Sequence, residues 1–397
     1  MTSRLGLWLT AGATIGGILV APYLQPPLVL TLITILIAAV LFLIRRTKYP
    51  AIALTVIALL YGTGFLSLFV FAGTLAIVVL GEVAFRLVSG GTMRSYLAYI
   101  AAAGIGSVFV MVYLGHATPF IPLMGVLVGV LLKSALQGRF DSLMIEHLGV
   151  AMTMFLFDEL NFQVDLMLLL AAVIIAASLA YFSYRFRVAD LSGLVSAAIV
   201  GILLIVFADV RWFLIMLTFL ILGSVCTRFR FDRKIEMGVA QSHGGVRGYF
   251  NVFANGLVAV AAAVSYGVFQ DELFLALFLG SVASAAADTV ASEIGVVGET
   301  PYLITTLERV PPGTNGGVTM VGEVAAVCAA TVVGLVAFVL GVADLPLVIV
   351  CIAAGFVGTN VDSVVGATLE NQGKIGNSGT NLVATLMGGL FAALFYL

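Results

Sequence analysis

Long apolar runs, separated by short polar breaks, fill the chain from residue 6 to residue 397. Breaks that are rich in charged residues, glycine or proline divide it into about fifteen segments of roughly 17–20 residues, each long enough to cross a bilayer as a helix. The pattern predicts an all-α polytopic membrane protein without a separate soluble domain. We place the spans at 6–23, 27–44, 50–66, 67–85, 96–114, 118–134, 145–160, 165–183, 189–208, 211–226, 250–268, 272–294, 323–341, 345–368 and 379–397.

Composition agrees with this pattern. Hydrophobic residues make up 62% of the chain and charged residues 10%, and the net charge of −2 argues against a nucleic-acid partner. The first apolar run lacks a small-residue cleavage site, so we expect a first span rather than a removed signal peptide. The three scattered cysteines exclude a disulfide framework or a cysteine zinc site.

The distribution of charge predicts the orientation. When the spans are paired as hairpins, every lysine and arginine except Arg211 falls on the side where the chain starts. Because basic loops are retained in the cytoplasm during insertion, we expect a multi-pass protein of the cell membrane with a cytoplasmic N-terminus.

The chain is expected to contain two modules. Residues 1–183 have short loops and few intramembrane polar groups, whereas residues 184–397 carry long polar loops at 227–249, 296–322 and 370–378. The first module is interpreted as a scaffold, a lipid-facing extension or an oligomer surface, and in the last case a homodimer is expected.

Two segments of the second module place carboxylates among small residues. In "ADTVASEIG" (287–295), Asp288 and Ser292 share a helix face and Glu293 lies one position round; "VDSVVGATLE" (361–370) places Asp362 and Glu370 similarly. A charged carboxylate in hydrocarbon is costly, so such residues usually face a polar cavity or a cation. The alternative is a helix-end position at the membrane surface, or a protonated and hydrogen-bonded side chain. The similarity of the two segments indicates either two related halves around one site or a chance resemblance.

The loop "TTLERVPPGTNGGVTMVGE" (305–323) is rich in glycine and hydroxyl residues. Backbone N–H groups in such a turn can bind phosphate, helped by the N-terminus of the following helix. It is not a P-loop, because "GTNGGV" lacks the Lys-Ser/Thr ending. The alternative is an ordinary Pro-Gly loop, although Glu323 at the start of the next span is unusual there.

Basic and amide residues flank the same helices. In the segment 227–256, positive-inside retention and anionic lipid headgroups account for Arg228 and Arg230. Arg247 stands just before an apolar span that carries two asparagines at i and i+4 spacing, and polar groups at such positions need partners. A second asparagine pair occurs at 377 and 381, where Asn377 is alternatively a helix cap.

Together these residues indicate chemistry on a phosphate-rich substrate at the cytoplasmic face. Magnesium binds a few carboxylates together with substrate phosphates, and phosphoryl transfer depends mainly on positioning and charge neutralisation. The apolar helices suit a lipid tail. The residues alone therefore favour a membrane enzyme that acts on a lipid phosphate or alcohol with a nucleotide.

These motifs, with "GVRGYFNVFANG" (245–256) and the 370–381 segment, resemble a family of integral membrane proteins that includes plant phytyl-phosphate kinase and animal transmembrane protein nineteen. The likeness runs from about residue 184 to the C-terminus. The aspartate motif also distantly resembles CTP-dependent polyprenol kinases and CDP-diacylglycerol synthases. The resemblance implies a kinase that converts an isoprenoid monophosphate to its diphosphate with CTP or another nucleoside triphosphate.

On this hypothesis the site residues fall into three groups. We expect Mg²⁺ to be held by Asp288, Glu293, Glu323 and Asp362, and phosphate charge to be neutralised by Lys234 and Arg247. The nucleotide and acceptor are expected to be bound by Asn251, Asn255, Ser292, Thr305, Thr306, Gly313, Thr314, Asn315, Gly316, Gly317, Thr319, Ser363, Asn377 and Asn381. The rival hypotheses are a polyprenol kinase, a CTP-dependent cytidylyltransferase on a lipid phosphate, and a secondary transporter whose carboxylates bind a coupling ion.

Overall fold

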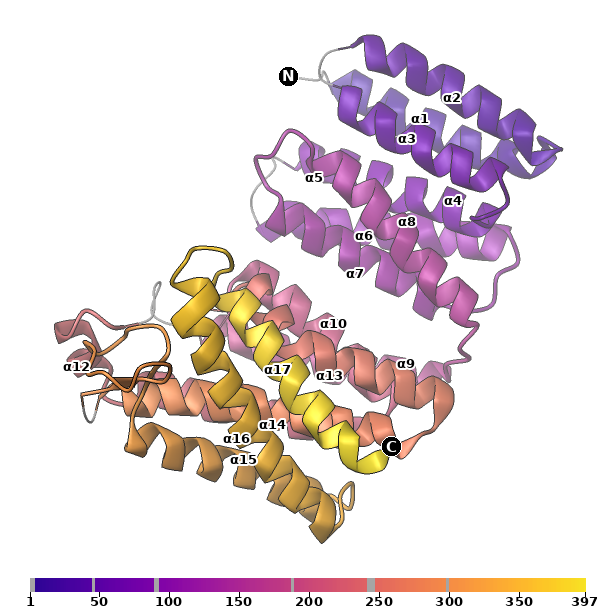
Figure 1. The fold of residues 1–397 in the computed structure, drawn as a ribbon. Coiled ribbons are helices and arrows are strands. Elements are labelled where there is room, and N and C mark those ends of the chain that lie inside the picture. The colour runs from indigo at the N-terminus through magenta and orange to yellow at the C-terminus, as the bar shows by residue number, and fades with distance from the viewer. Residues whose placement is uncertain (1–3, 45–46, 89–92, 187–188, 241–246, 298–299) are drawn as a thin grey trace. The chain divides into compact units, whose positions relative to one another are not determined.

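The computed structural model describes residues 4–44, 47–88, 93–186, 189–240, 247–297 and 300–397. The chain divides into two compact units, Met1–Leu169 and Leu170–Leu397 (Figure 1). The division falls inside α9 (Leu166–Arg185), so that most of this helix belongs to the second unit, whereas the sequence pattern placed the module boundary near its C-terminal end, at about residue 184.

The first unit consists of antiparallel apolar helices. Its elements are α1 (Arg4–Val20), α2 (Pro27–Leu43), α3 (Lys48–Gly62), α4 (Leu68–Leu75), a π-helical segment (Ala76–Leu80), α5 (Gly81–Leu87), α6 (Met93–Tyr113), α7 (Phe120–Ala135) and α8 (Ser142–Leu160). Helices α2 and α3 pack together, as do α7 and α8, and α8 also contacts α3 and α4.

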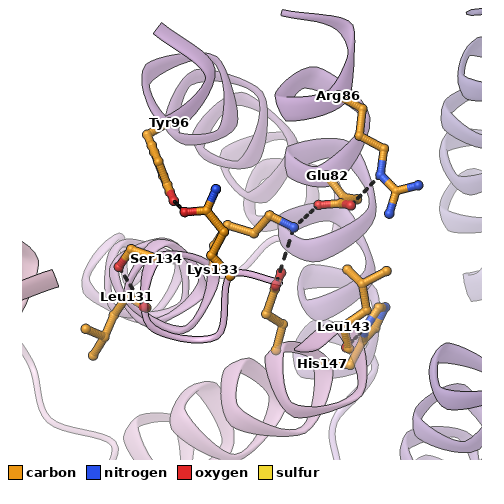
Figure 2. A network of polar contacts seen from close by, with 10 residues as sticks. Glu82, Arg86, Tyr96, Leu131, Lys133, Ser134, Leu143 and His147 are labelled. Carbon is orange, nitrogen blue, oxygen red and sulfur yellow. Dashed lines mark hydrogen bonds and ion pairs between the residues drawn. The ribbon is translucent and has the colours of Figure 1, made fainter. Parts of the chain in front are cut away.

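A buried charged cluster joins three helices of this unit (Figure 2). The Lys133 ammonium of α7 forms an ion pair with Glu82 of α5 and lies 3.6 Å from the Glu146 carboxylate of α8, which is fully buried. Arg86 bonds the other oxygen of Glu82 at 2.5 Å. The charges of this cluster compensate one another across helices that are distant in the sequence.

The second unit contains the remaining helices and a small hairpin. Its elements are α9, α10 (Leu191–Phe207), α11 (Val210–Arg228), α12 (Phe231–Glu236), α13 (Tyr249–Phe269), α14 (Glu272–Gly295), β1 (Tyr302–Leu303), β2 (Gly317–Val318), α15 (Met320–Val339), α16 (Leu345–Val365) with a π-helical extension (Gly366–Glu370), and α17 (Asn377–Ala393) with a final 3₁₀ turn (Leu394–Tyr396). The strands are antiparallel, with Tyr302 opposite Val318.

Helix α14 is the centre of the second unit and packs against α11, α13, α15, α16 and α17. Its alanine and serine residues allow this, because small side chains let helix backbones approach closely. The Ser284 hydroxyl donates to the Ala384 carbonyl of α17 at 2.9 Å, and a Cβ at Gly358 of α16 would overlap Ser284. The alanine-rich run therefore serves mainly to place α16 and α17 directly against α14.

The all-α polytopic fold is confirmed. Among the described residues, ten helices are long and apolar enough to cross a membrane, and α2, α3, α7 and α10 are shorter apolar helices. Each predicted span overlaps one of the helices, α8 included. The exact number of spans and the cytoplasmic side of the N-terminus stay predictions.

Candidate functional site

A cavity of about 770 Å³ lies in the second unit, between the helix ends that surround the 301–319 loop. We call it the polar cavity. Residues from α10, α13, α14, α15, α16 and α17 line it together with that loop. The site residues expected from the sequence that line it are Arg247, Asn251, Asp288, Ser292, Glu293, Gly313, Thr314, Asn315, Gly316, Gly317, Thr319, Glu323, Asp362, Ser363 and Asn377.

Five of the expected site residues do not line the polar cavity. Thr305 and Thr306 belong to the hairpin that precedes the glycine-rich turn, and Lys234 is buried under α11. Asn255 and Asn381 each lie one helical turn beyond an asparagine that does line the cavity, and both are buried in helix packing. A spacing of four residues places two side chains on one helix face but one turn apart, so only the first of each pair reaches the cavity.

Asp288 and Asp362 meet at the wall of the polar cavity. Their carboxyls, on α14 and α16, lie within hydrogen-bonding reach of each other, and Thr359 also approaches Asp288. Within the described part of the chain, Asp362 Oδ1 is buried and has no hydrogen-bond partner. An ionised carboxylate accepts hydrogen bonds but donates none. The facing pair therefore requires a proton or a cation to satisfy it.

Glu293 lines the cavity but already has partners. Its carboxylate forms an ion pair with Lys234 and accepts a hydrogen bond from the Thr227 hydroxyl at 3.2 Å. The Lys234 ammonium also donates to the carbonyl oxygens of Cys226 (2.9 Å) and Thr227 (3.2 Å), in the last turn of α11. A lysine there complements the negative end of the helix dipole. The short helix α12 thus returns Lys234 to α11, where it neutralises Glu293 instead of facing the cavity.

The four carboxylates expected to bind metal divide into a pair and two separate groups. Glu323 accepts a hydrogen bond from the Asn360 amide at 3.1 Å. Among the described residues, no three histidine, cysteine, aspartate or glutamate side chains come together as a complete metal site. Asp288 and Asp362 are the two that face each other, and Asp362 Oδ1 has no hydrogen-bond partner among the described residues. This arrangement suits Mg²⁺, which often takes one or two protein carboxylates and completes its shell with water and substrate phosphates.

The glycine-rich turn is held by backbone hydrogen bonds and by α16. Ile304 N–H donates to the Gly316 carbonyl at 3.0 Å, and Gly317 N–H donates to the Thr314 carbonyl at 2.9 Å. Gly316 has a positive φ of 78°, and a Cβ there would lie 2.5 Å from the Ser363 carbonyl oxygen. Only glycine fits this backbone conformation and this close approach. Ser363 follows Asp362, so the turn is fixed beside the aspartate pair.

Arg247 lines the polar cavity in front of α13. Its guanidinium lies over the Phe219 ring, 5.1 Å from the centroid, and its carbonyl accepts from the Asp190 N–H at 3.1 Å. Burial lowers the pKa of Arg247 to about 10, while Glu293 acts in the opposite direction, so the group stays protonated at neutral pH. No ion pair joins it to a carboxylate of the described residues. It is a half-buried cation that an anionic ligand can neutralise.

Asparagines also face the polar cavity. Asn377 is the first residue of α17, where Gly376 occupies the cap position and no side chain caps the helix, so the cap interpretation does not describe it. Asn255 donates to the Asn251 carbonyl at 2.9 Å. Asn251 and Asn377 thus offer side-chain amides to a ligand.

Several lining residues were not expected from the sequence, among them Asp190, Ser192, Thr359 and Ser378. Asp190 caps α10: its carboxylate accepts from the Gly193 N–H at 2.8 Å and from the Ser192 hydroxyl at 2.7 Å. A cap signal was present in "ADLSG", but nothing in the sequence ties this helix start to the distant aspartate motifs. Thr359 precedes Asp362 by three residues, and helical spacing alone would have found it.

The described lining is strongly acidic. Its carboxylates are Asp190, Asp288, Glu293, Glu323, Asp362 and Glu370, and the basic side chain among them is Arg247. Such a cavity repels free phosphate groups and favours divalent cations, so a phosphorylated ligand would bind best together with metal ions.

Comparisons with known proteins follow the same division of the chain. The family model described as integral membrane protein DUF92 matches residues 174–391. An uncharacterized membrane protein of Methanocaldococcus jannaschii, MJ0933, is 33% identical over 239 residues, which covers 60% of this chain and 98% of that protein. No solved structure matches the chain.

Two plant proteins are also similar. Protein PGR of Arabidopsis thaliana is 33% identical over 234 residues, covering 52% of this chain and 80% of that protein. The chloroplastic protein VTE6 of the same plant is 29% identical over 212 residues, covering 51% and 64% respectively.

Proposed function

The chain belongs to the DUF92 family of integral membrane proteins, and we propose that it is a kinase that transfers the γ-phosphoryl group of CTP, or of another nucleoside triphosphate, to an isoprenoid monophosphate. The observation that carries this proposal is the facing pair Asp288 and Asp362 beside a glycine-rich turn in one polar cavity. Phosphoryl transfer needs bound cations and positioned phosphates more than it needs covalent chemistry from the protein.

Magnesium fits the residues that are present. Asp288 and Asp362 would hold it, because Asp362 Oδ1 is buried without a hydrogen-bond partner among the described residues and faces a second carboxyl. When bound, Mg²⁺ neutralises charge on the β- and γ-phosphates. The acidic lining of the polar cavity also favours a bound cation, because without one the carboxylates would repel the phosphates of a nucleotide.

The chain's own groups have distinct roles in this reaction. The backbone N–H groups of Thr314 and Gly317 donate to carbonyls of the same loop, and other backbone N–H groups of the 313–319 turn bind the nucleotide phosphates. The Arg247 guanidinium binds the acceptor phosphate. Asn251 and Asn377 orient the acceptor. One oxygen of the acceptor phosphate attacks the γ-phosphorus, the bond to the bridging oxygen breaks, and the nucleoside diphosphate leaves with that oxygen. The ionised acceptor has no proton to lose, so no general base is required.

The family supports this choice of reaction at a coarse level. The sequence motifs resemble the family that includes plant phytyl-phosphate kinase, and VTE6 is among the relatives at 29% identity. Other relatives are uncharacterized membrane proteins, so the isoprenoid substrate is proposed from the resemblance to phytyl-phosphate kinase. We place the active site on the cytoplasmic face of the cell membrane, where nucleoside triphosphates are available.

The test is a product assay on purified protein. It is incubated with isoprenyl alcohols or monophosphates, each nucleoside triphosphate and MgCl₂, and the products are read by mass spectrometry. The proposal expects an isoprenyl diphosphate and CDP from the monophosphate and CTP. If the protein instead makes a monophosphate from the alcohol, it is a polyprenol kinase. If it releases pyrophosphate and makes a CDP-lipid, it is a cytidylyltransferase. Flux of substrate into proteoliposomes without nucleotide would replace it with a transporter.

A further inference from the structure

An apolar groove adjoins the polar cavity within the second unit. It has a volume of about 80 Å³ and lies between α9, α10, α11 and α13. Its walls include Ala176, Ala180, Val200, Phe213, Met216 and Gly256, and its few polar lining groups include Arg247 and Asn251. We call it the apolar groove.

Arg247 and Asn251 line both spaces. A cation and an amide therefore stand where a polar cavity and an apolar groove meet. This junction is complementary to an amphiphile that carries an anionic head on an apolar chain. The Arg247 guanidinium forms no ion pair with a carboxylate of the described residues. An anionic head group such as phosphate would therefore complement it.

The groove follows the helices away from Arg247. Its lining covers residues 176–183 of α9 and 213–220 of α11, which corresponds to about 10 Å along each axis at 1.5 Å per residue. Phe219, under the guanidinium, marks the end next to Arg247, and Phe213 lies nearly two turns further along α11. This length suits the first few isoprene units of a chain, with the remainder continuing into the bilayer.

Small residues keep the groove open. A Cβ at Gly256 would meet Val200 at 3.6 Å and Met216 at 4.0 Å, which are ordinary contacts, so that the position has space for a methyl group but faces other groove walls beyond it. A Cβ at Gly201 would lie 2.9 Å from the Phe213 ring and 3.1 Å from Ala176, so the wall is closed there. Gly256 is therefore the position from which the groove can be filled.

We infer that the apolar groove binds the phosphate-proximal isoprene units of the acceptor, with the acceptor phosphate at Arg247 and Asn251. The inference takes the isoprenoid identity of the lipid from the proposed function, but the junction itself does not depend on the phosphoryl transfer. It assigns α9, α10 and α11, which contribute little to the aspartate site, to recognition of the lipid.

The experiment is photo-crosslinking without nucleotide. The full-length protein is irradiated with farnesyl monophosphate that carries a diazirine on the isoprene unit next to the phosphate, and the labelled peptides are mapped by mass spectrometry. We expect labels within residues 176–183 and 213–220. We expect Gly256→Leu to reduce them about tenfold or more, because the added side chain fills the groove.

Three variants accompany it. Gly256→Ala adds only a Cβ that the groove accommodates and should label like the wild type. Ala261→Leu adds a larger side chain on the exposed face of the same helix and should also label like the wild type. Ala180→Leu fills the groove from α9 and should reduce labelling even if Gly256→Leu proves unable to fold.

The inference would be overturned if the wild type were labelled on α15 or on outward-facing helix surfaces. It would also be overturned if the groove were labelled but neither Gly256→Leu nor Ala180→Leu reduced the labelling. Its failure is distinct from that of the proposed function. Diphosphate synthesis without groove labelling refutes the groove alone, whereas groove labelling without diphosphate synthesis refutes the kinase and leaves the lipid phosphate site in place.

Discussion

Asp288 on α14 and Asp362 on α16 face each other one helical turn beyond the point where Ser284 and Gly358 bring the two helices into contact. Ser284 precedes Asp288 by four residues, and Gly358 precedes Asp362 by four, so each pair shares a helix face. Close packing at the glycine therefore imposes contact between two carboxyls. Such contact is unfavourable without a proton or a cation between them, and this is why we regard the pair as a metal site.

Replacing Asp362 by asparagine should stabilise the protein when no metal is present. In Asp362→Asn the amide can donate to Asp288 without the proton or cation that the two carboxyls of the wild type require, and a hydrogen bond to a charged group contributes about 1.5–3 kcal/mol. The measurement is thermal unfolding in detergent with EDTA and with MgCl₂. We expect the wild type to gain stability from Mg²⁺ and the variant to gain none. A variant that is still stabilised by Mg²⁺ to the same extent would remove Asp362 from the metal site.

A Cβ at position 358 should separate the aspartates without changing either of them. In Gly358→Ala the new methyl group overlaps Ser284 and approaches the Ala384 carbonyl at 3.0 Å, so α16 must shift. Overpacking of this kind costs about 1–3 kcal/mol, and we expect a lower melting temperature together with a weaker response to Mg²⁺. Gly104→Ala on α6 is the control, because nothing lies within 4 Å of its Cβ position. An unchanged Mg²⁺ response in Gly358→Ala would contradict the packing argument.

The ion pair of Lys234 and Glu293 should matter for stability more than for phosphate binding. Lys234→Met leaves a buried carboxylate without its cation, and breaking a buried pair on one side typically costs about 3–5 kcal/mol. The double variant Lys234→Met with Glu293→Gln removes both charges and should recover much of this loss. Unfolding of the single and double variants measures the coupling. Equal losses in Lys234→Met and in the double variant would show that the loss does not come from an uncompensated Glu293 carboxylate and would contradict this prediction.

The charged cluster of the first unit gives a parallel prediction (Figure 2). Lys133 holds Glu82 and Glu146 together, so Lys133→Met should destabilise the protein by about 3–5 kcal/mol. Glu146→Gln should have little effect or increase stability, because among the described groups the Glu146 oxygens accept no hydrogen bond and an amide is cheaper to bury than a charge. Thermal unfolding of the two variants checks the asymmetry; a Glu146→Gln loss as large as that of Lys133→Met would contradict it.

Local sequence patterns predicted the fold and much of the candidate site. Apolar runs located the helices, because in a membrane only helices or closed barrels satisfy the backbone. Helical spacing placed Asp288 and Asp362 at the ends of long spans, and the glycines at 313–317 marked a turn that the structure sets beside them.

Pairings between distant segments were not predictable in this way. Lys234 looked like a phosphate ligand until α12 was seen to return it to Glu293, and no local signal joins Glu82, Lys133 and Glu146 across three helices. The two asparagine pairs show the same limit. Their spacing showed that both members of a pair share a helix face, but it did not show that the polar cavity reaches only the first member. Which residue faces a cavity depends on how the helices pack, and no local pattern in the sequence shows that packing.

The most direct test of the central claim is the rate at which Asp288→Asn makes isoprenyl diphosphate from the monophosphate, CTP and MgCl₂. Asp271→Asn is the matched control: it makes the same change in charge at the other end of α14, where the side chain caps the helix through the Leu273 N–H at 2.9 Å and an asparagine can do the same. We expect Asp288→Asn to lose at least about 10²–10³-fold in rate while it stays folded, and Asp271→Asn to remain active. An Asp288→Asn protein that makes the diphosphate at the wild-type rate would contradict the account.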